Sequence, residues 1–509
     1  MDTLNLSAGI LVAVTVIYWL NRRARSRGLP IPGPKPHPFV GHTFQIPKIK
    51  TWKFFEKLAQ EHGPIVRVTL AGDDIVVLSD PADAEELLGR RSRIYSSRRP
   101  LVYAGKYMSN NMRLTLLPYG DNLKRQRAAF HSMLQPRVIG GYEDMQYTAS
   151  LRLLCDLVRK PEEFYLHFPR FPAGLIFTMS FGSRLADDGR DLAAVQKILM
   201  DFVIASNPGA HLVDSFPILD KLPDFLSPWR HEARAAHQEI IDLYGRLSRD
   251  VKARMVTEPE LECFTARLWE NQAKMNLSDE ELYFIAGSAF AAGTDTSSIT
   301  LLWFVMAMGL YPETMKKAQE EIDAVFGSDT LPNFSRMQEL RYTMALIKET
   351  IRWSPIAPLS FPHYLDADDE YKGHILKKGT TVISSLWNMH HDEEEYPNSY
   401  SFIPERFLQK GPTEGDAADK LGEGIFGFGF GRRQCPGQHL AAKSTWIAVV
   451  RTLWAFNIVP KTDASGNPMK LDVDDCTNGL TSRPKPFPVD FVPRSAAHLE
   501  TIRAEEARI

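Results

Sequence analysis

The chain has 509 residues, of which 44% are apolar and 24% charged, and its formal net charge is −2. This composition is typical of a globular protein with a large core, and the near-neutral charge argues against a nucleic-acid binder. The four cysteines, Cys155, Cys263, Cys435 and Cys476, form no Cys-x-x-Cys motif and no Cys/His cluster. A zinc site, an iron–sulfur cluster and a disulfide framework are therefore disfavoured, and we expect a reducing compartment for the folded body.

The first residues form a candidate membrane anchor. Residues 4–20 are apolar apart from three small polar side chains and carry no charge, and four arginines occur within residues 22–27. A helix of this length spans roughly 25 Å, close to the thickness of a bilayer core, and the arginines favour a cytosolic location for the body of the protein. A cleaved signal peptide is the alternative, but the basic cluster comes after the apolar run and no Ala-x-Ala-like site precedes it. We expect a transmembrane anchor over residues 1–21, in the endoplasmic reticulum membrane.

A linker and one large domain are expected after the anchor. Residues 22–42 are basic and then rich in proline, which favours a stiff, extended spacer. The remaining residues, 43–509, are expected to form a single catalytic domain facing the cytosol. Asn5 begins an Asn-x-Ser glycosylation pattern, but its place inside the apolar run argues against modification.

The body begins with a short helix and a hairpin. Residues 51–62 have apolar side chains at helical spacing, and residues 65–70 and 75–78 are β-branched runs around a turn. From Pro81 onward helical patterns dominate, which predicts a mainly α fold with small β-sheets. Near the end of the chain we expect a polar loop and a charged tail that frays, at residues 411–420 and from Ser495.

A long helix is predicted between Ser278 and Pro312. The run Ser278-Asp-Glu-Glu281 is a capping box that opens the helix, and the proline closes it. At 1.5 Å per residue this helix is about 50 Å long, and because it is apolar almost all round we expect it to be buried.

The middle of this helix carries residues that stability does not explain. Gly293 costs about 1 kcal/mol relative to alanine, and a buried, unpaired Asp295 would cost several more. The hydroxyl of Thr296 can bond to the carbonyl four residues earlier and loosen the helix. A site that relays protons to a bound ligand is the favoured interpretation; a polar patch covered by bridging water is the alternative.

The segment from Phe428 to Gly437 reads Phe-x-x-Gly-x-Arg-x-Cys-x-Gly. A nearby positive charge and the N-terminus of the following helix both lower the pKa of a cysteine, and glycines let the backbone approach a flat or bulky group. A buried structural cysteine in a turn is the alternative. The full spacing instead favours Cys435 as the axial ligand of a haem iron.

Two further charged patterns are weaker when taken alone. Lys124 and Arg127 share one helix face, which points either to solvent or into a pocket for an anionic cofactor. Glu349 and Arg352 also share a helix face, and Arg406 offers a second guanidinium downstream. A buried glutamate between two arginines can join distant segments through planar, multidentate hydrogen bonds.

In this order and spacing, the motifs resemble the cytochrome P-450 superfamily of haem-thiolate monooxygenases, over residues 30–494. The chain looks most like the membrane-anchored fungal members, including those of the O-methylsterigmatocystin-oxidoreductase-like type. The resemblance implies a cytochrome P-450 fold, with haem (iron protoporphyrin IX) between the long central helix and the cysteine loop.

The resemblance also implies roles for individual residues. The residues implied to hold the haem are Cys435 as the proximal thiolate and metal ligand, Phe428 packed beside it, and Arg433, Arg127, Lys124 and His363 as propionate partners. The residues implied elsewhere are Asp295 and Thr296 for oxygen activation, Ala292 and Gly293 for the helix groove, and Glu349, Arg352 and Arg406 as a structural triad. One departure is Leu123, where the family often carries tryptophan; we expect Lys124 or water to replace that donor.

The electrons must come from another protein, because the chain lacks a nucleotide-binding fingerprint and a flavin module. The resemblance implies a membrane-bound NADPH–cytochrome P-450 reductase, with cytochrome b5 as an optional second donor. Docking is expected on the cysteine side of the molecule, at the four cations Lys124, Arg125, Arg432 and Lys443.

By the same resemblance, the substrate pocket draws on largely apolar segments. These are residues 101–117, 202–211, 284–296, 356–361 and 479–481. They favour a lipophilic substrate that enters from the membrane, such as a terpenoid or triterpenoid, or an aromatic polyketide, in secondary metabolism. A haem-thiolate isomerase or dehydratase, and a haem-binding protein without turnover, remain the alternatives; Asp295 and Thr296 argue against the first.

Overall fold

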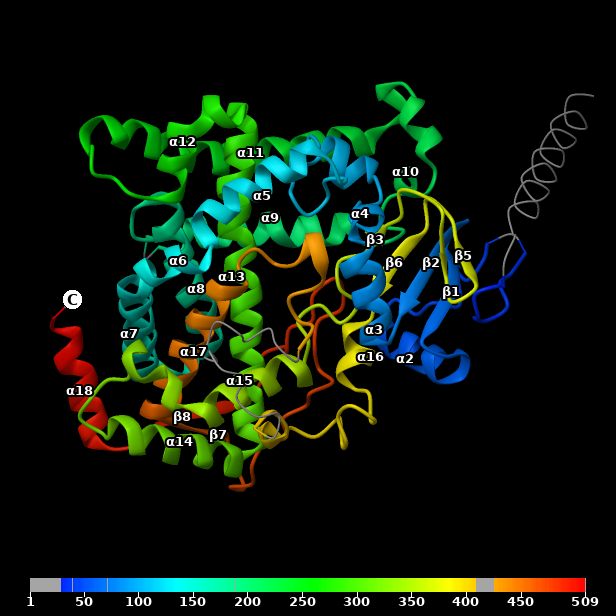
Figure 1. Cartoon of the computed structure of the whole chain (residues 1–509). Coiled ribbons are helices and arrows are strands. Elements are labelled where there is room, and N and C mark those ends of the chain that lie inside the picture. The colour runs from blue at the N-terminus through cyan, green and yellow to red at the C-terminus, as the bar shows by residue number, and fades with distance from the viewer. Residues whose placement is uncertain (1–28, 39, 71, 187, 409–424, 509) are drawn as a thin grey trace, which may run out of the picture.

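The computed structural model describes residues 29–508, apart from 39, 71, 187 and 409–424 (Figure 1). The expected anchor, Asn5, the basic part of the linker and the polar loop at 411–420 lie outside the described residues. Within the described ranges, no helix is both long and apolar enough to cross a membrane.

Helices make up most of the described chain, as the sequence predicted. The α-helices are α2 (Thr51–His62), α3 (Pro81–Ala84), α4 (Ser92–Tyr95), α5 (Asp121–Leu134), α6 (Pro136–Ile139), α7 (Glu143–Arg159), α8 (Phe164–Phe181), α9 (Arg190–Ser206), α10 (Leu212–Ser215), α11 (Pro228–Thr257), α12 (Phe264–Met275), α13 (Asp279–Leu310), α14 (Pro312–Phe326), α15 (Arg341–Trp353), α16 (Leu386–His390), α17 (Gln438–Ala455) and α18 (Ala496–Glu506). The strands are β1 (Ile65–Leu70), β2 (Asp73–Leu78), β3 (His363–Tyr364), β4 (Asp369–Tyr371), β5 (His374–Leu376), β6 (Thr381–Ser384), β7 (Phe456–Pro460) and β8 (Val489–Pro493).

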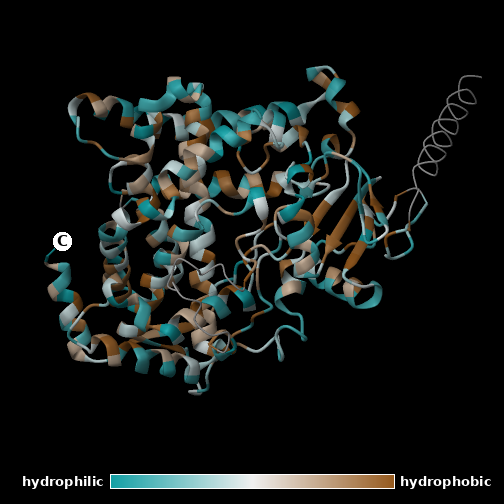
Figure 2. Ribbon diagram, viewed as in Figure 1, coloured by the Kyte–Doolittle hydropathy of each residue, from teal (hydrophilic) through white to brown (hydrophobic). Residues whose placement is uncertain are grey.

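The strands form three small sheets. The largest has the order β1-β2-β6-β3, and β4-β5 and β7-β8 are two-stranded. β1 and β2 form the predicted antiparallel hairpin, in which Ile65 lies opposite Leu78, and β2 then pairs in parallel with β6. This sheet lies at one side of the molecule, and Figure 2 shows its strands as mainly hydrophobic. The predicted fold class, mainly α with small sheets, is confirmed.

Helix α13 runs through the centre of the molecule, as predicted. Both hydrogen bonds of the Ser278 capping box are present, and the 32 residues of the helix span about 48 Å. Glycine lets two neighbouring side chains approach closely: a Cβ at Gly287 would lie 2.1 Å from the Tyr244 ring, and one at Gly293 would lie 2.9 Å from Ile176. These glycines therefore permit close packing of α8 and α11 on α13.

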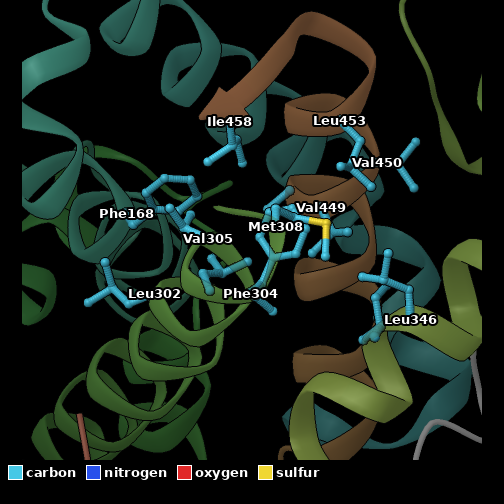
Figure 3. Close-up of a cluster of buried hydrophobic side chains, with 14 of the residues drawn as sticks. Phe168, Leu302, Phe304, Val305, Met308, Leu346, Val449, Val450, Leu453 and Ile458 are labelled. Atoms are coloured by element: carbon cyan, nitrogen blue, oxygen red, sulfur yellow. The ribbon is translucent and has the colours of Figure 1, made fainter. Parts of the chain in front are cut away.

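The second half of α13 is enclosed by a dense apolar core (Figure 3). The core joins α8, α13, α15, α17 and β7 through buried side chains. The labelled residues are Phe168, Leu302, Phe304, Val305, Met308, Leu346, Val449, Val450, Leu453 and Ile458. Because each fully buried side chain of this size contributes roughly 1.5–3 kcal/mol, this half of α13 is held rigidly.

The described part of the proline-rich linker lies against the sheet. The N–H of Arg67 donates to the Pro32 carbonyl at 2.8 Å, and a Cβ on Gly33 would lie 2.2 Å from the Arg67 carbonyl oxygen. The imidazole of His42 binds the Pro34 carbonyl at 3.0 Å. From Pro32 onward, the segment is therefore attached to β1.

The prediction of a fraying tail is wrong. Residues 496–506 form α18, which packs on α7 and buries Ile502 to 1% exposure. The hydroxyl of Tyr147 donates to Glu505 at 2.9 Å, and Arg159 pairs with Glu506. The polar composition concealed this helix because a few apolar contacts and ion pairs with α7 hold it.

Candidate functional site

The cysteine loop is a tight turn whose shape requires glycine. The N–H of Cys435 donates to the Phe428 carbonyl at 2.9 Å and closes the loop. Gly429 and Gly431 have φ of 74° and 53°, in the region that L side chains rarely adopt. A Cβ on Gly431 would also lie 2.2 Å from the Leu88 carbonyl oxygen, so larger residues are excluded there.

Cys435 lies just before the N-terminus of α17, which begins at Gln438. Burial raises the pKa of the Cys435 thiol, while the Gly437 N–H and the Arg127 guanidinium act in the opposite direction. Part of the residue nevertheless remains accessible. Such a sulfur is costly to ionise alone, and a metal ion bound to it would offset that cost.

The middle of α13 borders open space. Ala292 and Thr296 are exposed and Gly293 is partly exposed, although nearly all residues before and after them on the helix are buried. The Thr296 hydroxyl donates to the Ala292 carbonyl at 2.9 Å, which is the bond to the preceding turn that the sequence predicted. Figure 1 shows α17, the helix after the cysteine, running alongside α13.

Asp295 has a cationic partner that the sequence analysis missed. Its carboxylate pairs with Arg483, which also donates to the Ser298 hydroxyl at 3.4 Å. Burial raises the pKa of Asp295, and the Arg483 guanidinium opposes that shift. The carboxylate is therefore held in one orientation beside the open face of α13.

A group of buried and partly buried cations lies between the cysteine loop and the segment before α5. Arg433 donates to the backbone carbonyls of Ser96 at 2.6 Å and Leu114 at 3.2 Å, and also to that of Leu117. Burial and repulsion from Arg127 lower the pKa of Arg433 to about 10, against the opposing effect of Asp366.

Arg98 belongs to the same group and was not predicted. It donates to the carbonyls of Thr115, Phe361 and Pro362, at 3.2, 2.9 and 2.6 Å. Burial and repulsion from Arg433 lower the pKa of Arg98. We call Arg98, Arg127 and Arg433 the open arginine cluster, because the hydrogen bonds that the three donate in the described chain go to backbone carbonyls.

His363 adjoins the open arginine cluster. Its Nδ1 donates to the Tyr95 carbonyl at 2.7 Å, and burial, together with repulsion from Arg98 and Arg433, lowers its pKa well below the usual range. Lys124 is not brought into the cluster: it is exposed and pairs with Asp121 at 3.1 Å. Leu123, at the position of the expected tryptophan, is buried.

Comparison with known proteins identifies the family. The cytochrome P450 family model matches residues 31–491. The chain belongs to the cytochrome P450 family. It is 34% identical to cytochrome P450 monooxygenase 58 of Postia placenta, over 92% of this chain and 90% of the relative. It is also 34% identical to a cytochrome P450 monooxygenase of Armillaria gallica, over 96% and 94%, and to monooxygenase claR of Ampulloclitocybe clavipes, over 97% and 92%.

This cytochrome P450 is therefore an oxidoreductase of the monooxygenase type with a haem cofactor, and the family uses a redox partner and O2. Its residues fit that cofactor. Haem carries two propionates, and the open arginine cluster is a buried set of cations with an unbalanced charge. Cys435 supplies the soft ligand suited to the iron, and the glycines of its loop let the backbone approach.

A second group of arginines in this cytochrome P450 contains a carboxylate. Glu349 accepts from Arg352 at 2.7 and 2.8 Å, from Arg406 at 3.2 Å and from the Ile403 N–H at 2.7 Å. Glu349 and Arg352 are fully buried. Arg352 also donates to the carbonyls of His390 and Ser399, which joins α15 to two later segments. We call Glu349, Arg352 and Arg406 the closed triad; the sequence predicted this set.

The four cations expected to face the reductase have partners of their own. Arg125 pairs with Glu281 at 2.6 Å and Lys443 with Glu143 at 2.6 Å, and Lys124 is bound to Asp121 as described. Arg432 is exposed and contacts the Tyr119 hydroxyl. Acidic neighbours thus reduce the positive charge of this surface, which the sequence spacing did not reveal.

Proposed function

We propose that this cytochrome P450 inserts one oxygen atom of O2 into a C–H bond of a lipophilic small molecule, with electrons from NADPH–cytochrome P-450 reductase. The overall reaction is R–H + O2 + NADPH + H⁺ → R–OH + H2O + NADP⁺. The observation that carries the proposal is a combination of three features. Cys435 lies in a tight loop, the open arginine cluster has no carboxylate partner of its own, and α13 has an exposed, polar face although it is otherwise apolar.

Each group has a proposed role. Haem held by Cys435 supplies the oxygen chemistry, and the thiolate donates the electron density that favours O–O cleavage. Arg98, Arg127, Arg433 and His363 bind the propionates and fix the orientation of the cofactor. Phe428 packs beside the sulfur.

The proposed role of α13 is proton delivery. The Thr296 hydroxyl can exchange its bond to the Ala292 carbonyl for one to a bound ligand, and Asp295 supplies a carboxyl group that gains and loses a proton. Because Arg483 opposes the upward pKa shift of Asp295, Arg483→Gln should raise that pKa further. If the ionised carboxylate is required, the pH profile of product formation then moves to higher pH; an unchanged profile would argue against this role.

The substrate is proposed to be a terpenoid, triterpenoid or aromatic polyketide of secondary metabolism, in line with the O-methylsterigmatocystin-oxidoreductase-like members that the chain resembles. Apolar segments in the proposed pocket support this. Phe284 and Ala291 of α13, Phe202 of α9 and Tyr103 before α5 belong to one buried apolar cluster. Their side chains favour a lipophilic molecule, while the polar groups near them would set its orientation.

A location on the endoplasmic reticulum membrane, with the body in the cytosol, is part of the proposal. Besides the anchor expected at residues 1–21, the segment in and after α10 and the start of the described chain lie toward the same side of the molecule (Figure 1), and both carry exposed apolar side chains. They are Phe44, Ile49, Leu212, Phe216, Ile218, Phe225 and Leu226. A patch of this kind favours contact with lipid.

The decisive experiment uses the purified holoprotein. Wild type should give the carbon monoxide difference spectrum of a haem-thiolate, and Cys435→Ser should abolish both the spectrum and turnover. Cys155→Ser, at a buried cysteine of the apolar core, is the matched control and should retain the spectrum. An unchanged spectrum in Cys435→Ser would refute the ligand assignment.

Consumption of NADPH in the presence of reductase, O2 and a lipophilic substrate separates the remaining functions. A monooxygenase consumes NADPH and yields a product enlarged by one oxygen. Product without net consumption of NADPH would favour the isomerase or dehydratase, and a thiolate spectrum without any product across a wide lipophilic panel would favour a haem-binding protein.

The docking surface has its own test. Arg432→Glu should lower turnover supported by the reductase but spare turnover driven by peroxide, because peroxide needs no protein partner. Lys274→Glu, at an exposed lysine of α12, is the matched charge-reversal control and should affect neither. Equal loss of both activities in Arg432→Glu would contradict docking at this surface.

A further inference from the structure

Arg113 is a buried cation outside both the open arginine cluster and the closed triad. Arg113, in the loop before α5, is 4% exposed. Its guanidinium lies over the Phe202 ring, 4.1 Å from the centroid, and 6.0 Å from the centroid of Phe284. Its Nε makes a long contact of 3.4 Å with the Ser109 hydroxyl. Its Nη2 is buried without a hydrogen-bond partner among the described residues.

The neighbouring hydroxyl on α11 belongs to Tyr244, which is fully buried. The electrostatic influence of Tyr244, together with hydrogen bonding between its hydroxyl and the Arg113 guanidinium, partly opposes the lowering of the Arg113 pKa by burial. Within the described residues, no carboxylate is among the groups that shift the pKa of Arg113. Unlike Arg352 in the closed triad, Arg113 is thus a buried charge that the protein leaves uncompensated.

Arg113 lies beside the same helix, α13, that carries the exposed residues Ala292 and Thr296. Phe284, Ser288, Ala292 and Thr296 follow one another at intervals of four residues, so they form one row of neighbours that turns by about 40° at each step around the helix. The Ser288 hydroxyl in this row is likewise buried and without a partner in the described chain. Eight residues separate Phe284 from Ala292, which corresponds to about 12 Å along the helix.

We propose that Arg113, assisted by the Tyr244 hydroxyl, binds the carboxylate of an elongated lipophilic acid whose opposite end lies at Ala292 and Thr296. The inference rests on the proposed function and narrows its substrate class to acids. A carboxylate offers a negative charge and two oxygens that match the planar fork of a guanidinium. A neutral carbonyl would satisfy one N–H but leave the buried charge uncompensated.

The distance along α13 sets the position of oxidation. With the carboxylate at Arg113, the carbon nearest Ala292 and Thr296 lies about 12 Å away, measured along the helix. The acid should therefore be oxidised far from its carboxyl group. The apolar side chains between the two ends, including Phe202 and Phe284, contact the hydrocarbon part of the molecule.

The test measures binding to the holoprotein by isothermal titration calorimetry, without turnover. The probes are dodecanoic acid and dehydroabietic acid, each paired with its methyl ester, which removes the charge and keeps the hydrocarbon. At least one acid should bind wild type roughly 10- to 100-fold more tightly than its ester, the range expected for a charge-assisted hydrogen bond in a buried site.

Substitutions then assign the preference to one residue. Arg113→Met should remove the preference for the acid while leaving affinity for the ester within about threefold, a change too small to represent a lost charged contact. Arg113→Lys should keep part of the preference, because it retains the charge but not the fork. Arg125→Met is the matched control: this arginine pairs with Glu281, and its loss should leave the acid-to-ester ratio unchanged.

A purely structural role for Arg113 predicts a different pattern. Removal of an uncompensated cation should leave the melting temperature of ligand-free Arg113→Met equal to or above that of wild type. A lower melting temperature together with equal losses for acid and ester would overturn the proposal. If Arg113→Met does not fold, the role of Arg113 is decided by the acid-to-ester affinity ratios of Arg113→Lys and of wild type.

Two other outcomes would overturn the inference. One is equal binding of both acids and both esters to wild type, and the other is an acid preference that survives in Arg113→Met. Both are distinct from a failure of the proposed function, which would show as a missing thiolate spectrum or missing NADPH consumption. A normal spectrum without any acid preference overturns only the role of Arg113.

Discussion

The closed triad and the open arginine cluster are both largely buried groups of arginines, but only the first contains a carboxylate. In the closed triad, Glu349 receives hydrogen bonds from Arg352 and Arg406, so both guanidiniums share a carboxylate partner within the protein. In the open cluster, Arg98 and Arg433 donate to backbone carbonyls and repel each other. The first arrangement has its anion within the chain, whereas the second is proposed to receive one from the haem propionates.

The difference supports different proposed roles for the two groups. A buried ion pair is costly to break because one charge is left without its partner, so the closed triad joins α15 to the segments around Ser399 and Arg406. A buried cation without a carboxylate raises the energy of the empty protein, and the ligand recovers that energy on binding. Arg113 likewise has no carboxylate partner among the described residues, and its proposed ligand is the carboxylate of the substrate.

The largest effect is expected in the closed triad. Glu349→Gln leaves two buried guanidiniums without their carboxylate and should reduce the free energy of unfolding by about 3–5 kcal/mol. Urea unfolding monitored by circular dichroism measures this loss. Glu405→Gln is the matched control: Glu405 lies one residue before Arg406, is partly exposed and pairs with Lys317. Exposed ion pairs contribute little to the free energy of unfolding. A comparable loss of unfolding free energy in Glu405→Gln would therefore contradict the special role of the closed triad.

The open cluster should respond through cofactor retention. Arg98→Met removes one of the cations proposed to bind the propionates, and the rate of haem transfer to apomyoglobin should rise roughly 10- to 100-fold, the cost of a lost charge-assisted hydrogen bond. Arg91→Met is the control, because Arg91 is paired within the protein with Glu86 and Asp369. If both variants released haem equally fast, charge balance would not distinguish the two kinds of arginine.

The last effect is spread over several pH units and concerns a histidine beside the closed triad. Burial lowers the pKa of His391 to about 3, so the folded protein holds this imidazole neutral while the unfolded chain takes up a proton below about pH 6.5. Its contribution is therefore complete above pH 6.5 and is lost as the pH falls toward 3, by at most about 1.4 kcal/mol per pH unit.

His391→Gln should flatten the fall of unfolding free energy between pH 6.5 and 4, measured in urea at each pH. Glutamine can still donate to the Trp387 carbonyl that the His391 Nδ1 binds at 2.9 Å. His131→Gln, at an exposed position of α5, is the control and should leave the slope unchanged. An identical slope in wild type and His391→Gln would show that this histidine does not titrate as described.

Several elements could be predicted from the sequence because their signals are local. A capping box, an apolar run and a proline defined α13, and glycines at set distances from a cysteine defined the loop of Cys435. Glu349 and Arg352 lie three residues apart on one helix, so their pairing could be inferred from helical geometry. These are contacts between residues close in the chain, or motifs whose spacing carries the chemistry.

Arg98, Arg113 and Arg483 escaped prediction because their partners are distant in the chain. Arg483 meets Asp295 across 188 positions, and Arg98 meets Pro362 across 264. An isolated arginine in a loop has no periodicity that indicates burial. The helix α18 was missed for a related reason, since its contacts with α7 come from a polar stretch.

The sequence by itself determined the mainly α fold, the central helix, the cysteine loop and the haem-thiolate class, because each depends on local propensity or on fixed spacing within one segment. Only the tertiary structure decided which buried charges have an oppositely charged partner. Burial determines how much free energy a charge costs, and contacts between segments far apart in the chain determine whether a partner lies close to it. The surroundings and the proposed roles of Arg98, Arg113 and Arg483 therefore depend on the folded chain.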